Sequence, residues 1–204
     1  MRESIIAAGE KLFASEDAAK VSLRKIAALA GYSPGTIYQY FPDQQALFLA
    51  IREIDLAAAT KGLALIAKST SDPAERVRLV FVGAVKYWRK HFEQFQVLHS
   101  LPPTRPSPHY WDGSTFGQSK AVVASYKLYE GVIRELFDSF PKDPMPLKLA
   151  TDALIAATHG VISFPMYTRT MNWSNATRMA EAVVNSFIES WSAIATERTS
   201  VEHA

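Results

Sequence analysis

Cysteine is absent from the 204 residues of this chain. Disulfide frameworks and thiolate metal sites are therefore excluded, because both require cysteine sulfur. A large excess of charge of one sign is also missing, since 22 lysines and arginines against 20 acidic residues leave a formal net charge of +2. Any surface that binds nucleic acid must then be local, because the chain as a whole is not a polycation.

Long hydrophobic runs are missing as well, and we expect no secretory leader. The longest apolar stretch without charged residues, 153–167, contains His159 and is shorter than the ~20 residues that span a bilayer. The N-terminal run MRESIIAAGEKLF carries Glu3 and Glu10 inside its apolar pattern, which is typical of an amphipathic helix and not of a signal peptide. The sequence therefore predicts a cytoplasmic protein without a membrane partner.

The common signatures of catalysis are not found in the sequence. It contains no H-E-x-x-H motif, no glycine-rich phosphate loop and no G-x-S-x-G elbow. His91 and His99 are two helical turns apart, which is too far for both to bind one metal ion. We expect no enzyme activity, no metal site and no cofactor.

What the chain does contain is apolar residues at helical spacing along almost its whole length, whereas the two-residue alternation of strands is rare. This pattern predicts an all-α fold. Prolines interrupt it in residues 101–113 and in the run PKDPMP. Asp72 followed by proline marks one helix start, with Glu75 placed to complete a capping box. After an N-terminal helix and two short ones, we expect helices over residues 44–68, 73–99, 114–140, 147–170 and 174–196.

The most informative stretch is SLRKIAALAGYSPGTIYQYF, from Ser22 to Phe41. Ser22 is placed to cap a first short helix, and Gly31 is placed to end it in the left-handed conformation. Ser33 then caps a second short helix with Pro34 in its first turn, where proline is best tolerated. Two short helices joined by a tight glycine turn predict a helix-turn-helix.

The two faces of this motif differ in chemistry. Apolar residues can pack the helices together, and they are Leu23, Ile26, Ala27, Ile37 and Phe41. The outward face of the second helix carries hydroxyl, amide and aromatic groups that suit the major groove, on Ser33, Gly35, Thr36, Tyr38, Gln39 and Tyr40. Residues 18–42 contain three basic residues, Lys20, Arg24 and Lys25, and no acid, which favours contact with phosphates.

Over residues 2–52 the sequence resembles the TetR family of transcriptional regulators. The resemblance lies in the first helix, in the helix-turn-helix stretch and in the following DQQALFLAI. It implies a three-helix DNA-binding head in residues 1–45 and a helical ligand-binding and dimerisation domain in residues 46–204. By position it also assigns base or phosphate contacts to Ser33, Thr36, Tyr38 and Gln39, and phosphate-side contacts to Tyr40, Ser22 and Lys25.

Two positions in this region depart from the family pattern. Pro34 and Gln44 stand where family members often carry lysine, so each departure removes a potential phosphate contact. Both residues remain in the predicted DNA-binding set together with Gly35. The departures also keep an alternative open, in which the chain is a helical protein-interaction module that has lost DNA recognition.

The C-terminal part is rich in amphipathic helices and aromatic residues. A pocket between these helices is the functional interpretation, and the candidate ligand-binding residues are Phe81, Trp88, Phe92, Tyr126, Tyr129, His159 and Phe164. Core packing is the alternative role for each of them. His159, in a run similar to a signature of some family members, is either a polar anchor for a ligand or a helix–helix contact.

The last two predicted helices carry apolar stripes that include Leu154 and Trp191, and we expect these stripes to form a dimer interface. The alternative is that an all-helical unit buries such stripes within its own chain. The function expected from the whole sequence is a ligand-responsive transcriptional regulator, a repressor. It would bind a palindromic double-stranded DNA operator as a homodimer, and a small apolar or aromatic effector would release it.

Overall fold

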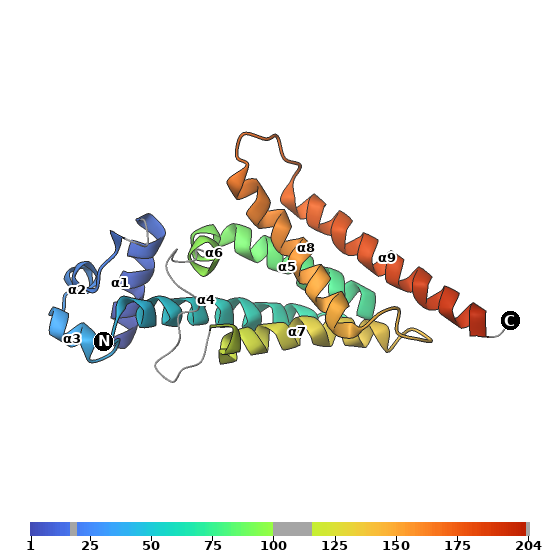
Figure 1. Ribbon diagram of the computed structural model, residues 1–204, viewed down its shortest axis with the longest axis horizontal. Coiled ribbons are helices and arrows are strands. Elements are labelled where there is room, and N and C mark those ends of the chain that lie inside the picture. The colour runs from blue at the N-terminus through green and yellow to red at the C-terminus, as the bar shows by residue number, and fades with distance from the viewer. Residues whose placement is uncertain (17–19, 100–115, 203–204) are drawn as a thin grey trace. The chain divides into compact units, whose positions relative to one another are not determined.

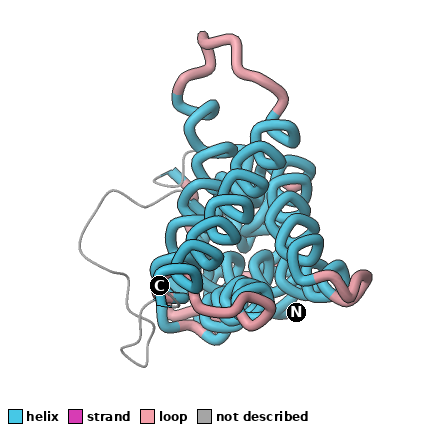
Figure 2. Tube along the Cα trace, turned by 90° about the vertical axis from the view of Figure 1, so that its right-hand side faces the viewer, coloured by secondary structure: helices cyan, strands magenta, loops and turns pink. Residues whose placement is uncertain are grey.

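The computed structural model describes residues 1–16, 20–99 and 116–202. This described part contains helices and loops but no strand, as Figure 2 shows, so the predicted all-α class is confirmed. A short 3-10 turn, Phe116–Gln118, precedes α7. The α-helices are α1 (Arg2–Ser15), α2 (Leu23–Ala30), α3 (Pro34–Tyr38), α4 (Gln44–Ala67), α5 (Pro73–Lys90), α6 (Phe92–His99), α7 (Lys120–Phe137), α8 (Leu147–Tyr167) and α9 (Ala176–Glu202).

The chain forms two compact units, each built from two segments of sequence. The first unit contains Met1–Ala58 and His91–Ala124, and the second contains Ala59–Lys90 and Ser125–Ala204. Helices α4 and α7 each contribute residues to both units, so the division does not coincide with a helix boundary.

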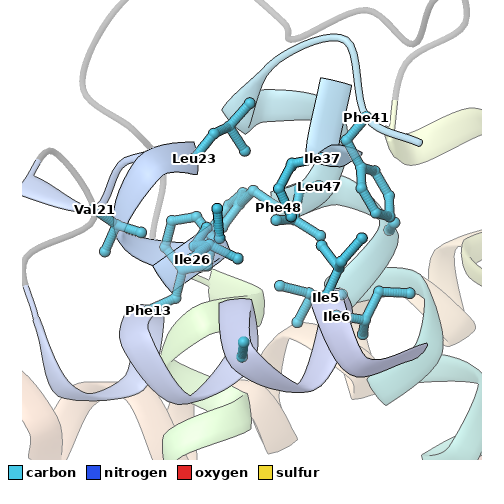
Figure 3. Close-up of a cluster of buried hydrophobic side chains, with 14 residues drawn as sticks. Ile5, Ile6, Phe13, Val21, Leu23, Ile26, Ile37, Phe41, Leu47 and Phe48 are labelled. Atoms are coloured by element: carbon cyan, nitrogen blue, oxygen red, sulfur yellow. The ribbon is translucent and has the colours of Figure 1, made fainter. Parts of the chain in front are cut away.

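The core of the first unit joins the short N-terminal helices to the start of α4 (Figure 3). Ile5 of α1, Ile26 of α2 and Ile37 of α3 are fully buried and belong to one apolar cluster. Phe13 and Phe48 meet edge to face in the same cluster, with their ring centroids 4.9 Å apart. This cluster fixes which faces of α2 and α3 point inward, and it thereby leaves their polar faces outside.

The second unit is a helical bundle in which α5, α8 and α9 pack against one another. Figure 1 shows α8 and α9, in orange and red, as neighbouring helices joined by the loop of residues 168–175. Trp191 of α9 is buried and meets Phe137 of α7 edge to face at a centroid distance of 5.3 Å. Leu154 of α8 is also fully buried. Trp191 and Leu154 were expected at a dimer interface, but both are core residues of their own chain.

One predicted helix, over residues 73–99, is in fact two helices. The break falls at His91, between the end of α5 at Lys90 and the start of α6 at Phe92. Trp88 is buried on one side of the break and Phe95 on the other, seven residues apart, so the apolar spacing continues across it. Neither proline nor glycine stands at the break, and the sequence pattern therefore contains no signal for it.

The helix starts and ends agree with the local sequence signals, with small differences. Asp72 caps α5, since its Oδ1 accepts a hydrogen bond from the Ala74 amide at 2.9 Å. Glu75 does not complete the predicted capping box and pairs with Arg78 instead. Asn175 caps α9 by accepting from the Thr177 amide, and α9 continues six residues beyond its predicted end at 196. The proline-rich residues 101–113 lie outside the described residues.

Helix α8 is long and apolar enough to cross a membrane by length and composition, with a mean hydropathy of 1.2. It is the one such helix in the described part of the chain. Within the second unit it packs against both α5 and α9. Its buried Thr158 donates a hydrogen bond to the backbone oxygen of Leu154 at 2.8 Å. This packing is typical of a core helix in a bundle.

Candidate nucleic-acid interface

Helix α2 begins and ends at the residues that the sequence predicted. The Ser22 hydroxyl accepts a hydrogen bond from the Lys25 amide at 3.3 Å, so Ser22 is the N-cap. Gly31 follows the helix with φ 75° and ψ 28°, in the left-handed region that glycine adopts without steric cost. The Tyr32 amide then donates to the Ala27 oxygen at 2.9 Å, which closes the turn before the next helix.

Helix α3 is a five-residue helix capped by Ser33, with Pro34 in its first turn. The Ser33 hydroxyl accepts from the Thr36 amide at 3.2 Å and lies 2.9 Å from the Thr36 hydroxyl. Ile37, fully buried, and Phe41, 3% exposed, attach the helix and the residue after it to the core. The outward face of α3 is thus held in one orientation from both of its ends.

The predicted DNA-contacting residues occupy the surface of this motif. Tyr38 is 56% exposed and Tyr40 is 40% exposed, so neither ring is part of the core. Of the remaining predicted residues, Lys25, Ser33, Pro34, Gly35 and Gln39 are exposed, while Ser22, Thr36 and Gln44 are half-buried. An exposed row of hydroxyl, amide and phenol groups on one short helix can approach the edges of bases.

The charge of this surface is smaller than the sequence suggests, because Lys25 is paired. Its Nζ lies 2.7 Å from Oε2 of Glu16, and both side chains are partly exposed. An exposed ion pair of this kind is worth ~0–1 kcal/mol, so a DNA phosphate can replace the carboxylate at little cost. Lys20 and Arg24 are also exposed, and neither has an ion pair within the described residues.

Arg2 is a further basic residue of this region that the sequence analysis did not select. It is exposed, and its guanidinium carbon lies 5.3 Å from the centre of the Phe41 ring, just after α3. The contact is a cation–π interaction that keeps a positive charge beside the end of α3. No sequence pattern pairs residue 2 with residue 41, so only the packing of α1 against the motif reveals it.

The candidate ligand-binding residues are distributed between the core and the surface. Phe81 and Tyr129 are buried with ring centroids 4.8 Å apart, and Trp88 is buried as well. Phe164 is 56% exposed and meets Trp173 edge to face at 5.6 Å. Phe92 lies in the first unit, half-buried at the start of α6.

Two candidates of this set carry polar groups. The Tyr126 hydroxyl donates a hydrogen bond to Oδ1 of Asp152 at 2.9 Å, and burial together with this bond raises the pKa of Tyr126. Burial lowers the pKa of His159, which favours its neutral form at neutral pH.

The described residues contain no cluster of three or more potential metal ligands.

The geometry defines a class of protein: an all-helical protein with an N-terminal helix-turn-helix and a larger C-terminal helical part. Residues 5–51 match the family model described as bacterial regulatory proteins, tetR family. The N-terminal region of this chain is therefore similar in sequence to the TetR family of bacterial regulatory proteins, and the match covers under a quarter of the chain. No curated protein sequence matches the chain.

Solved structures extend the similarity of fold to almost the whole chain. The transcriptional regulator FadR from Bacillus subtilis, in complex with stearoyl-CoA, matches with a TM-score of 0.76 at 15% identity, over 93% of this chain and 99% of that one. FadR from Bacillus halodurans, a fatty acid degradation regulator, matches with a TM-score of 0.73 at 15% identity, covering 92% and 94%. SmeT, the repressor of the Stenotrophomonas maltophilia multidrug efflux pump SmeDEF, matches with a TM-score of 0.72 at 19% identity, covering 94% and 90%.

Proposed function

We propose that this protein is a cytoplasmic, ligand-responsive transcriptional repressor that binds a palindromic operator as a homodimer. In this proposal residues 1–45 bind DNA, and residues 46–204 bind a small apolar or aromatic effector and form the dimer. The observation that carries it is the exposed polar face of α3, held in place by the buried side chains of Ile37 and Phe41.

The chemistry of that face supports reading of bases in the major groove. Gln39 can make two hydrogen bonds to the edge of an adenine, and the methyl and hydroxyl groups of Thr36 can contact a thymine methyl or a base acceptor. The phenol of Tyr38 adds a large exposed surface with a polar tip. Arg2 and Arg24 supply positive charge for the phosphates on either side.

Exposed faces of α8 and α9 support dimerisation. Ala182, Ser186 and Ser190 are exposed at four-residue spacing on α9, so they form one stripe of small side chains. Phe164 and Tyr167, near the end of α8, are 56% and 79% exposed. Small residues allow two helices to approach closely, and exposed apolar groups gain free energy when they are covered. A two-fold pair of chains would present its α3 helices to half-sites ~34 Å apart or somewhat farther.

Two proteins of the same fold support an apolar effector. The Bacillus subtilis FadR structure contains stearoyl-CoA, and SmeT represses a pump for multiple drugs. In this proposal the effector would contact the aromatic residues of α5 and α7, of which Phe81, Trp88 and Tyr129 are buried in the structure. The effector must bind the conformation that is unable to bind DNA more tightly, and a coupling of ~1–3 kcal/mol would weaken DNA binding roughly 5–150-fold.

The test is a gel-shift titration of the protein on the promoter DNA next to its own gene, at several salt concentrations. We expect salt-sensitive binding to a palindrome, because phosphate contacts release counterions. Tyr38→Ala should weaken it by ~1–3 kcal/mol, roughly 5–150-fold. Leu29→Ala is the matched control, because Leu29 is 46% exposed on α2 of the same motif and is outside the predicted contact set.

The alternative function, a protein-interaction module, is favoured by Pro34 and Gln44 at positions where family members often carry lysine. It predicts no salt-sensitive binding to any DNA of the promoter region and no difference between Tyr38→Ala and Leu29→Ala. Specific binding that Tyr38→Ala weakens and Leu29→Ala does not would exclude this alternative.

A further inference from the structure

The second unit contains an open cleft that none of the candidate ligand-binding residues lines. It lies between the C-terminal end of α4, the start of α5 and the middle of α7, and its volume is about 350 Å³. This volume lies near the lower end of the ~300–1,000 Å³ of small-molecule sites. The cleft is therefore large enough for a small ligand.

Positive charge predominates around the cleft. Lys68, Arg76 and Lys127 line it, and Glu135 is the acid among its lining residues, so three positive charges and one negative leave +2. The ammonium groups of Lys68 and Lys127 have no hydrogen bond or ion pair within the described residues. Both lysines are exposed, so their charges are available to a ligand without breaking an existing interaction.

Arg76 is held in place but is not fully satisfied. Its Nη1 donates to Glu135, and its Nη2 donates to the backbone oxygen of Thr70 at 2.6 Å. Its Nε is buried and has no hydrogen-bond partner. The bonds to Glu135 and Thr70 hold the guanidinium charge in place at the cleft, where a ligand anion can pair with it.

The rest of the lining is apolar. Ala64 and Ala67 contribute from α4, and Leu128 and Val132 contribute from α7. Gly131 also lines the cleft, and a Cβ at this position would meet no atom within 4 Å, so the space beside it is open. A ligand that was only a charged group would leave this apolar surface in water, whereas an apolar body attached to the charge would cover it.

We propose that this cleft binds a small amphipathic anion, a carboxylate or phosphate head on a short apolar body. The head lies by Lys68, Arg76 and Lys127, and the body lies over the alanines of α4 and beside Gly131. This site is additional to the aromatic residues of α5 and α7. The proposal does not require that the protein binds DNA, so either one can fail without the other.

Isothermal titration calorimetry tests the proposal with four probes below their micelle concentrations: octanoate, octyl phosphate, octan-1-ol and inorganic phosphate. We expect saturable binding of an octyl anion, with an affinity at least roughly tenfold higher than that of octan-1-ol or of inorganic phosphate, because the charged head and the apolar body both contribute to binding. The ratio between octanoate and octyl phosphate identifies which head the cleft prefers. Equal affinity for octan-1-ol, or no binding of either octyl anion, would overturn the proposal.

Two variants locate the binding. Lys127→Gln should weaken the octyl anion roughly 3- to 10-fold, whereas Lys86→Gln, an exposed lysine of α5 outside the cleft, should not. Gly131→Leu should abolish binding by filling the cleft, and leucine favours a helix over glycine, so the fold is retained. Gly62→Leu is its control, because Gly62 lies on α4 outside the lining and has similar open space. Equal effects of each variant and its control would refute this site.

Discussion

A half-buried carboxyl in the first unit makes the stability of this protein depend on pH in an unusual direction. Asp55 lies on α4, and its Oδ2 is buried without a hydrogen-bond partner. Burial, and then the nearby negative charge of Glu10, raise the pKa of Asp55 from 3.8 to about 7. Glu10 itself accepts a hydrogen bond from Nε2 of Gln94 at 2.9 Å, which holds its carboxylate in place.

The direction of this pH dependence follows from which state of the chain, folded or unfolded, binds the Asp55 proton more tightly. Between pH 4 and pH 7 the folded chain keeps the proton on Asp55, while the unfolded chain loses it at its ordinary pKa of ~3.9. The free energy of unfolding therefore falls as pH rises through this window and levels off above it. A shift of about three pH units corresponds to at most ~4 kcal/mol, and partial exposure to solvent reduces this to ~1–2 kcal/mol.

Asp55→Asn removes the ionisation and keeps the shape of the side chain. We expect the variant to be ~1–2 kcal/mol more stable than the wild type at pH 8 and more stable by roughly a third of that at pH 5. The difference is already present at pH 5 because the unfolded chain has lost most of the Asp55 proton there, and it grows until the folded chain loses the proton as well. Urea denaturation followed by circular dichroism at pH 5, 6, 7 and 8 measures the difference. Glu10→Gln should give a smaller effect of the same sign, because it removes the second cause of the shift. A variant that is less stable at every pH, or a difference that does not change with pH, would refute the reasoning.

Three further substitutions test the packing and the local geometry. Trp191→Ala should lower the free energy of unfolding, measured by urea denaturation, by ~3–5 kcal/mol, because the indole is buried against Phe137 and Phe187. A loss under ~1 kcal/mol would contradict the place of Trp191 in the core. Gly31→Ala should lower the free energy of unfolding by ~1 kcal/mol, because alanine is strained at a φ of 75°. A Cβ at this position meets no atom within 4 Å, so the loss would come from the backbone conformation and not from a clash. An unchanged melting curve would argue against the left-handed turn. Ser22→Ala should cost ~1 kcal/mol by removal of the cap of α2, and Ser22→Thr should recover most of it if the hydroxyl is responsible.

Much of the N-terminal motif was predictable because its signals are local. Ser22, Gly31 and Ser33 act on amides and carbonyls within three or four residues, so their effects do not depend on the rest of the fold. The apolar spacing of Ile26 and Ile37 predicted which faces would be buried, and both are fully buried. The exposed face of α3 follows from these same constraints by elimination.

The sequence alone did not reveal features that depend on residues far apart in the chain. The turn at His91 interrupts an apolar pattern that continues on both sides of it, so the sequence predicted one long helix. Lys25 was expected to face phosphates, but Glu16, nine residues earlier, pairs with it. Arg2 was overlooked because its partner, Phe41, comes from another helical segment.

The amino-acid sequence by itself determined the helical class, the helix-turn-helix and the polar face of its second helix, because those follow from hydrogen bonds and periodicities that are local to each segment. Only the tertiary structure decided which aromatic residues of the larger part are core, that Trp191 packs inside its own chain, and that Lys68, Arg76 and Lys127 surround one cleft. An apolar stripe has the same sequence pattern whether it meets its own chain, a second chain or a ligand. Lys68 just after α4, Arg76 on α5 and Lys127 on α7 form one site only when these helices are packed together.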